Sequence, residues 1–116
     1  MTIQRFENGP RMSRVVVHND TVYLAGLTAE ATVGKSVGEQ TTEILAKIDG
    51  LLKQGGTDKS KLLQATIWVT DIRNRAAMNE VWSAWVDPKN LPARACVEAK
   101  LADPKCLVEI MVIAAK

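Results

Sequence analysis

The sequence predicts an α+β domain in which two helices pack on one face of a β-sheet. Three observations support this prediction. Several short runs are rich in β-branched residues, two longer segments repeat apolar residues at helical spacing, and no repeat, linker or low-complexity tract divides the chain. A chain of 116 residues can bury a core without disulfides or metals. We therefore expect one domain over residues 1–116, with the element order β-β-β-α-β-α-β-β.

The first three elements are predicted to be strands. A short strand is expected at residues 2–6, and residues 15–26, VVVHNDTVYLAG, consist of two β-branched runs joined at Asn19 and Asp20. Asn and Asp tolerate the positive φ of a tight turn, so this segment predicts a hairpin.

Two segments, residues 38–54 and 74–86, have the apolar periodicity of amphipathic helices. The first carries Ile44, Leu45, Ile48, Leu51 and Leu52, and the second Ala77, Met78, Val81, Trp82 and Trp85. Gly55 and Gly56 stop the first helix, and the Asp87-Pro88 pair stops the second. The three tryptophans are expected to make core or subunit contacts.

Three later segments are predicted to be strands: LLQATIWVTDI at 62–72, LPARACVEAKL at 91–101 and LVEIMVIAA at 107–115. Because strand side chains alternate, Arg94, Cys96 and Glu98 share one face. Glu109 is the lone acid within a run of aliphatic residues. A half-buried arginine and a buried acid need each other or a ligand, which leaves a structural ion pair and a functional site as equal alternatives.

The composition narrows the function classes. Fifteen basic and thirteen acidic residues give a net charge of +2, which provides no electrostatic support for nucleic-acid binding. The single histidine, His18, makes a His-rich metal site unsupported. Two cysteines without a CxxC pattern, and the lack of a signal peptide, favour reduced thiols in a cytoplasmic setting. No apolar run is long enough to cross a membrane. We expect neither a metal nor a cofactor.

Several segments together resemble the RidA family (YjgF/RutC-like proteins) over nearly the whole chain. They are GP at 9–10, VYLAG at 22–26, ATIWVTDI at 65–72, AAMNEVWSAW at 76–85, PARACVEAKL at 92–101 and LVEIMVIAA at 107–115. The strongest signal is the PARACVE strand followed, thirteen residues after Cys96, by Glu109. The resemblance implies a chorismate-mutase-like fold and a homotrimer whose sheets form a barrel, with clefts between subunits. It also implies hydrolysis of reactive enamines and imines to 2-ketoacids and ammonia.

By resemblance, Arg94 corresponds to the arginine that binds the substrate carboxylate, and Glu109 to the glutamate that handles water and protons. The planar guanidinium can make two parallel bonds to a carboxylate, which suits this role. Cys96 corresponds to a cysteine at the same site, where a positioning role is expected because imine hydrolysis needs no thiol nucleophile. Asn79 matches an asparagine at the subunit boundary, and Gly26 a glycine that approaches the cleft closely.

The chain departs from the family pattern near this site. Arg11 stands where many members have tyrosine after Gly-Pro, Ala25 replaces a serine or threonine, and Met111 stands where a further acid is common. A second cation at Arg11 favours a more acidic ligand than simple aminoacrylate.

Two other function classes stay open. One is an endoribonuclease or translation inhibitor, and the other is a non-catalytic trimer that binds small ligands or acts like a chaperone. The presence of both Arg94 and Glu109 favours the enzyme over the non-catalytic trimer, and the near-neutral charge weighs against the ribonuclease.

Overall fold

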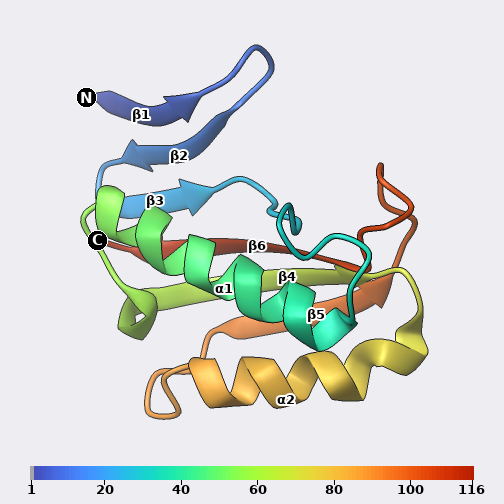
Figure 1. The fold of residues 1–116 in the computed structure, drawn as a ribbon. Coiled ribbons are helices and arrows are strands. Elements are labelled where there is room, and N and C mark those ends of the chain that lie inside the picture. The colour runs from blue at the N-terminus through green and yellow to red at the C-terminus, as the bar shows by residue number, and fades with distance from the viewer. Residues whose placement is uncertain (1) are drawn as a thin grey trace.

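The computed structural model describes residues 2–116, which form one mixed six-stranded sheet with two helices on one face (Figure 1). The elements in chain order are β1 (Ile3–Asn8), β2 (Ser13–His18), β3 (Thr21–Leu24), α1 (Val37–Gln54), β4 (Leu62–Val69), α2 (Arg75–Trp85), β5 (Ala93–Glu98) and β6 (Val108–Ala115). Two 3₁₀ turns, η1 (Lys59–Lys61) and η2 (Ile72–Asn74), flank β4. The predicted fold class and order of strands and helices are confirmed.

The strands are arranged in the order β1-β2-β3-β6-β4-β5, so the last strand of the chain lies inside the sheet between β3 and β4 (Figure 1). Strands β4 and β5 are parallel and are joined through α2, whereas the other neighbours are antiparallel. The two edges of the sheet are therefore β1 and β5.

The helix α1 begins and ends where its flanking residues satisfy the free backbone groups. The Ser36 hydroxyl accepts a hydrogen bond from the Glu39 amide, which forms the N-terminal cap. At the other end, Gly56 adopts a positive φ of 88°. Gly55 lies so close to β3 that a Cβ there would stand 2.7 Å from Val22 Cγ1, which explains why a residue without a side chain occupies this position.

Element ends differ from the predictions by a few residues. The β2–β3 hairpin turns at Asn19, whose φ is 55°, as expected. Strand β4 ends at Val69 rather than at residue 72, because the Asp71 carboxylate accepts a hydrogen bond from the Arg73 amide and starts η2. Strand β5 occupies only residues 93–98 of the predicted 91–101, and β1 continues two residues beyond 6.

The core lies between the helices and the sheet. Alternate residues of the central strand β6 point into it: Val108, Ile110, Val112 and Ala114 are all buried. The opposite face of the sheet, which we call the open face, has no helix over it (Figure 1). Tyr23 on β3 and Val97 on β5 are 42% and 46% exposed, and both lie outside the helix-covered core. Within residues 2–116, neither helix has the length and apolar character of a membrane span.

Candidate functional site

Arg94 lies on the edge strand β5, on the face that α2 covers. Its guanidinium carbon stands 5.4 Å from the centre of the Trp82 ring, within the range of a cation–π interaction. Within residues 2–116 it takes part in no ion pair and no side-chain hydrogen bond. It borders a cavity of about 430 Å³, here called the arginine cavity, lined by Asn79, Trp82, Ser83, Val86, Pro88, Leu91 and Arg94. The donors of Arg94 are thus free for an anion.

The other residues on this face of β5 do not neutralise Arg94. The Glu98 carboxylate accepts a hydrogen bond of 2.9 Å from the Ile72 amide, so it serves to hold η2. Cys96 is a free, half-buried thiol that packs against the core. Arg94, Cys96 and Glu98 pair with the buried β4 residues Ala65, Ile67 and Val69, which is consistent with the predicted shared face. Cys96 has the surroundings of a small apolar residue.

Asn79, on α2, lines the same cavity. Its Oδ1 atom is buried and has no hydrogen-bond partner within residues 2–116. A buried carbonyl oxygen without a donor costs free energy, so such a group is usually satisfied by a ligand, a water or a partner. Arg94 therefore offers an unpaired donor set at a cavity that Asn79 also lines, whereas the Asn79 Oδ1 atom itself is buried.

Glu109 lies elsewhere, on the open face of β6 opposite Trp68 of β4. The carboxylate of Glu109 lies against Gly26, where an added Cβ would stand 2.2 Å from Glu109 Oε2. Leu27 fixes this contact, because its amide donates to the Ile110 carbonyl at 2.9 Å and its carbonyl accepts from the Ile110 amide at 3.1 Å. Gly26 therefore lies close to the Glu109 side chain, and its predicted place at a ligand cleft stays a prediction.

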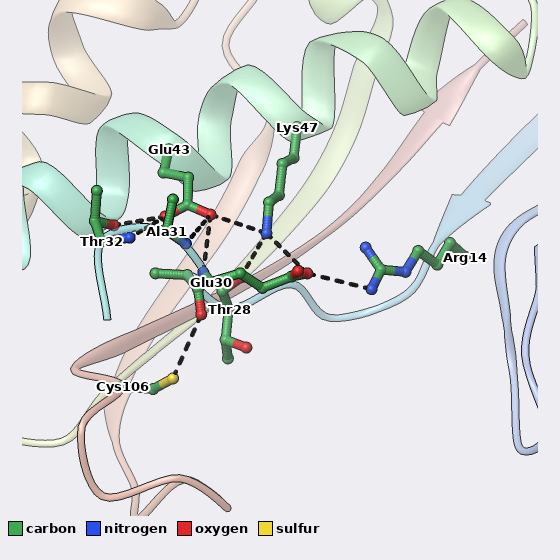
Figure 2. Close-up of polar contacts among 9 residues, drawn as sticks. Arg14, Thr28, Glu30, Ala31, Thr32, Glu43, Lys47 and Cys106 are labelled. Carbon is green, nitrogen blue, oxygen red and sulfur yellow. Dashed lines mark hydrogen bonds and ion pairs between the residues drawn. The ribbon is translucent and has the colours of Figure 1, made fainter. Parts of the chain in front are cut away.

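The loop that follows Gly26 is held on α1 by the Glu43 carboxylate (Figure 2). Glu43 accepts hydrogen bonds from the amides of Glu30, Ala31 and Thr32 at 2.8, 3.2 and 2.8 Å, and from the Thr32 hydroxyl at 2.6 Å. Burial favours the neutral form of this carboxyl, but the bonds from Thr32 and Glu30 outweigh it and hold the pKa of Glu43 well below its usual range. Glu43 therefore anchors the segment that carries Gly26.

Two cations complete this network. Lys47 lies 3.0 Å from both Glu43 and Glu30, and Arg14 lies 3.4 Å from Glu30 (Figure 2). Lys47, first by its hydrogen bond, and then Arg14 lower the pKa of Glu30. The network ties β2, the loop and α1 together on the side of the molecule that carries Gly26.

Arg11 lies in the exposed loop between β1 and β2. It borders a cavity of about 200 Å³ with Glu7, Gly9, Pro10, Met12 and Arg14. An adjoining hollow of about 140 Å³ shares Met12 and Arg14 and includes Gly26. Arg11 therefore belongs to the Gly26 side of the molecule and not to the arginine cavity.

The structure divides the predicted site residues into two groups. Arg94 and Asn79 line the arginine cavity, and Cys96 lies on the same face of β5 but packs against the core. Glu109, Gly26 and Arg11 lie on the other side of the sheet or at its end. We call Arg94, Cys96 and Asn79 the arginine group, and Glu109, Gly26 and Arg11 the glutamate group.

The two groups are too far apart to act together within one chain. The partners of Arg94 and Glu109 on β4 are Ala65 and Trp68, three residues apart, and β4 separates β5 from β6. Strand spacings of about 4.8 Å and a rise of about 3.3 Å per residue place the two Cα atoms about 14 Å apart. Their side chains also point to opposite faces. The alternative of an ion pair between Arg94 and Glu109 within the chain is wrong.

Three contributions were missed in the sequence. Its helical spacing predicts a core or subunit contact for Trp82, but the face of its ring also makes a cation–π contact with Arg94. Glu43 and Arg14 were not singled out, although both shape the surroundings of Gly26. The spacing of Glu43 and Lys47, four residues apart on one helix, was the available signal for part of this network.

No cluster of three or more His, Cys, Asp and Glu side chains that could hold a metal ion occurs within the described chain, residues 2–116.

Comparison with known proteins places this geometry in a family. The sequence profile described as Endoribonuclease L-PSP matches residues 2–116. A RutC family protein of Haemophilus influenzae is 46% identical over 114 residues, covering 98% of each chain. The RutC family protein YoaB of Escherichia coli is 43% identical over 115 residues, covering 99% of each chain. The crystal structure of NMB1025, a member of the YjgF protein family from Neisseria meningitidis, superimposes with a TM-score of 0.96 at 43% identity and covers 100% of this chain and 96% of its own. The chain therefore belongs to the Endoribonuclease L-PSP family, which includes the RutC and YjgF proteins and is the family that its motifs indicated.

Proposed function

We propose that the protein hydrolyses reactive enamines and imines of 2-amino acids to 2-ketoacids and ammonia, without a cofactor, in clefts between the subunits of a homotrimer. The observation that carries this proposal is Arg94, whose guanidinium borders a cavity of about 430 Å³ and has no acidic partner within residues 2–116. An unpaired arginine fork at a cavity suits a carboxylate ligand.

The arginine group would hold the substrate. The carboxylate of a 2-imino acid accepts two parallel bonds from Arg94, and Asn79 forms part of the cavity wall beside it. Cys96 contributes packing beside Arg94 rather than a nucleophile. Arg11 approaches the same cleft from the neighbouring subunit and favours substrates with additional negative charge.

The glutamate group would supply the chemistry. Water adds to the carbon of the C=N bond, and Glu109 takes a proton from that water and returns one to the nitrogen. The tetrahedral adduct then loses ammonia and leaves the 2-ketoacid. An enamine must first gain a proton on carbon, which converts it to the imine, and Glu109 is the acid available for that step.

A small substrate can meet both groups only where two chains contact each other. An imino acid is shorter than the separation of about 14 Å between Arg94 and Glu109 in one chain. The open face, with partly exposed apolar residues on several strands, is a suitable surface for a second copy. A cyclic trimer would pair the arginine group of each chain with the glutamate group of its neighbour.

The first test generates imines in situ with an amino-acid oxidase and follows their disappearance with and without the protein. Arg94→Ala is expected to abolish the acceleration while the trimer persists. Glu109→Gln is expected to retain binding of a 2-ketoacid and to lose turnover. An unchanged rate in either variant removes that residue from the mechanism.

The shared cleft is tested by mixing the two inactive variants. When Arg94→Ala and Glu109→Gln chains are unfolded and refolded together in equal amounts, about a quarter of the clefts receive both intact residues, one from each chain. We expect about a quarter of wild-type activity. The control is the same mixture without unfolding, which should stay inactive. A refolded mixture of trimers without activity refutes the shared cleft.

The description of the matching family profile supports a second candidate, an endoribonuclease that acts as a translation inhibitor. Incubation with RNA tests it directly, and RNA cleavage that survives the Arg94→Ala change would place that activity outside the proposed cleft. His18, the one histidine of the sequence, lies at the end of β2, so a pair of catalytic histidines is not available. A trimer that binds 2-ketoacids but accelerates neither reaction would support the third class, a non-catalytic binding protein.

A further inference from the structure

The wall of the arginine cavity includes Trp82, which belongs to an aromatic pair that the proposed reaction does not by itself require. Trp82 is almost fully buried, and one face of its ring lies under the Arg94 guanidinium at 5.4 Å. Trp82 and Trp85 pack at a tilt of 52° with their ring centres 5.5 Å apart. Tilted aromatic pairs of this kind are favourable because the positive edge of one ring meets the negative face of the other.

Trp85 is in turn held by polar contacts from two other elements. Its Nε1 donates a hydrogen bond of 3.0 Å to the Asp49 carboxylate on α1. The Lys59 ammonium lies 5.2 Å from the centre of its ring and donates to its backbone carbonyl at 2.6 Å. The orientation of Trp82 is therefore supported by a residue that is fixed to α1 and to η1.

We infer that Trp82 is a positioning residue for Arg94: its ring face orients the guanidinium so that the donors of the fork stay directed at the substrate carboxylate. A carboxylate partner in the chain would occupy those donors, whereas a ring face attracts the cation and leaves its edge free. Glu98, the acid on the same face of β5, is used by the Ile72 amide instead. The inference rests on the proposed function for the carboxylate nature of the ligand.

The test measures binding of 2-oxobutanoate by calorimetry, because affinity does not depend on turnover. Trp82→Met replaces the ring by a flexible apolar chain and is expected to raise Kd about five- to thirtyfold. Trp82→Phe retains a ring face and is expected to stay within about threefold of wild type. In kinetics with the imine, the Met variant is expected to raise KM more than it lowers kcat. Equal affinity in the Met variant and the wild type overturns the inference.

A second measurement removes the risk that Trp82→Met disturbs folding. Biosynthetic replacement of tryptophan by trifluorotryptophan preserves the shape of the ring but weakens the negative charge of its face. It is expected to raise Kd about two- to fivefold in the wild type and to leave Kd unchanged in Trp82→Phe, where Trp68 and Trp85 are still fluorinated. An effect that persists in Trp82→Phe assigns it to another tryptophan and overturns the inference.

Failure of the proposed function gives a different result. A wild type that binds 2-oxobutanoate with the Trp82 dependence above but hydrolyses no imine refutes the deaminase and supports the role of Trp82. A folded wild type that binds no 2-oxobutanoate overturns the inference, because Arg94 is then not a carboxylate site.

Discussion

Adding one methyl group at Gly26 should disable Glu109 while leaving the fold in place. The Cβ of an alanine at this position would stand 2.2 Å from Glu109 Oε2 and 3.2 Å from its Cδ. No other residue lies among its nearest contacts. The perturbation is therefore aimed at one carboxyl group, which sits at the end of a flexible side chain.

The size of the effect follows from this distance. To move from 2.2 Å to the 3.4 Å of an ordinary contact, the carboxylate oxygen must shift by about 1.2 Å. A misplacement of about 1 Å in a catalytic group can cost about 100-fold in rate. The folding cost is small, because displacing a side chain from its rotamer costs about 0.5–1.5 kcal/mol, and Gly→Ala recovers about 0.4–1 kcal/mol by restricting the unfolded chain.

We therefore expect Gly26→Ala to lose about 100-fold in kcat for imine hydrolysis with a change in unfolding free energy below about 1 kcal/mol. Stopped assays of imine loss and urea unfolding measure the two quantities. The matched control is the double variant Gly26→Ala with Glu109→Ala, which should be no less active than Glu109→Ala alone, because no carboxylate remains to be displaced.

A fully active Gly26→Ala enzyme would refute the catalytic role of the Glu109 carboxylate in its observed position. A loss of several kcal/mol in stability would refute the argument that only Glu109 has to move.

Three further predictions concern the loop, the thiol and the open face. Glu43→Gln should lower the unfolding free energy at pH 7 by about 1–3 kcal/mol. Because the folded pKa of Glu43 is depressed, its stabilisation is present above the ordinary value of 4.5 and is lost as pH falls toward the folded pKa. The gap between wild type and Glu43→Gln in urea unfolding should therefore narrow below about pH 4.5, and a constant gap would contradict this. Cys96→Ala should retain imine hydrolysis within about tenfold, since no thiol nucleophile is needed, whereas complete loss with a normal fold would show that the thiol takes part. Val97→Asp should dissociate the proposed trimer in light scattering, while Ile72→Asp, at a similarly exposed position outside the sheet, should not. A trimer that persists in Val97→Asp would remove this part of the open face from the proposed interface.

The elements of the fold could be predicted because each has a local cause. The hairpin turn at Asn19 and the end of α1 at Gly55 and Gly56 follow from residue types whose backbone preferences are strong. The end of β4 was misjudged, because the Asp71 side chain bonds to a backbone amide two residues further on and competes with the ladder. The pattern of apolar residues does not indicate where a side chain will bond to the backbone in place of a neighbouring strand.

The order of the strands could not be predicted from local patterns. The pairing of β3 with β6 joins Tyr23 to Ile113, and no periodicity within either strand specifies that partner. Alternation did establish that Arg94 and Cys96 share a face, but it could not relate that face to the one that Glu109 occupies. Only the observed positions of β5 and β6 show that the two residues lie on opposite faces.

The central position of β6 has a consequence for the synthesis of this protein. The first three strands and the β4-α2-β5 unit leave the ribosome before β6 does, so one edge of β3 and one edge of β4 stay unpaired until β6 has emerged. Folding by long-range pairing is slow, and exposed edges during that wait are places where chains can associate wrongly. Glu109 lies on β6 itself. A nascent chain therefore acquires the proposed catalytic carboxylate only with the strand that completes its sheet.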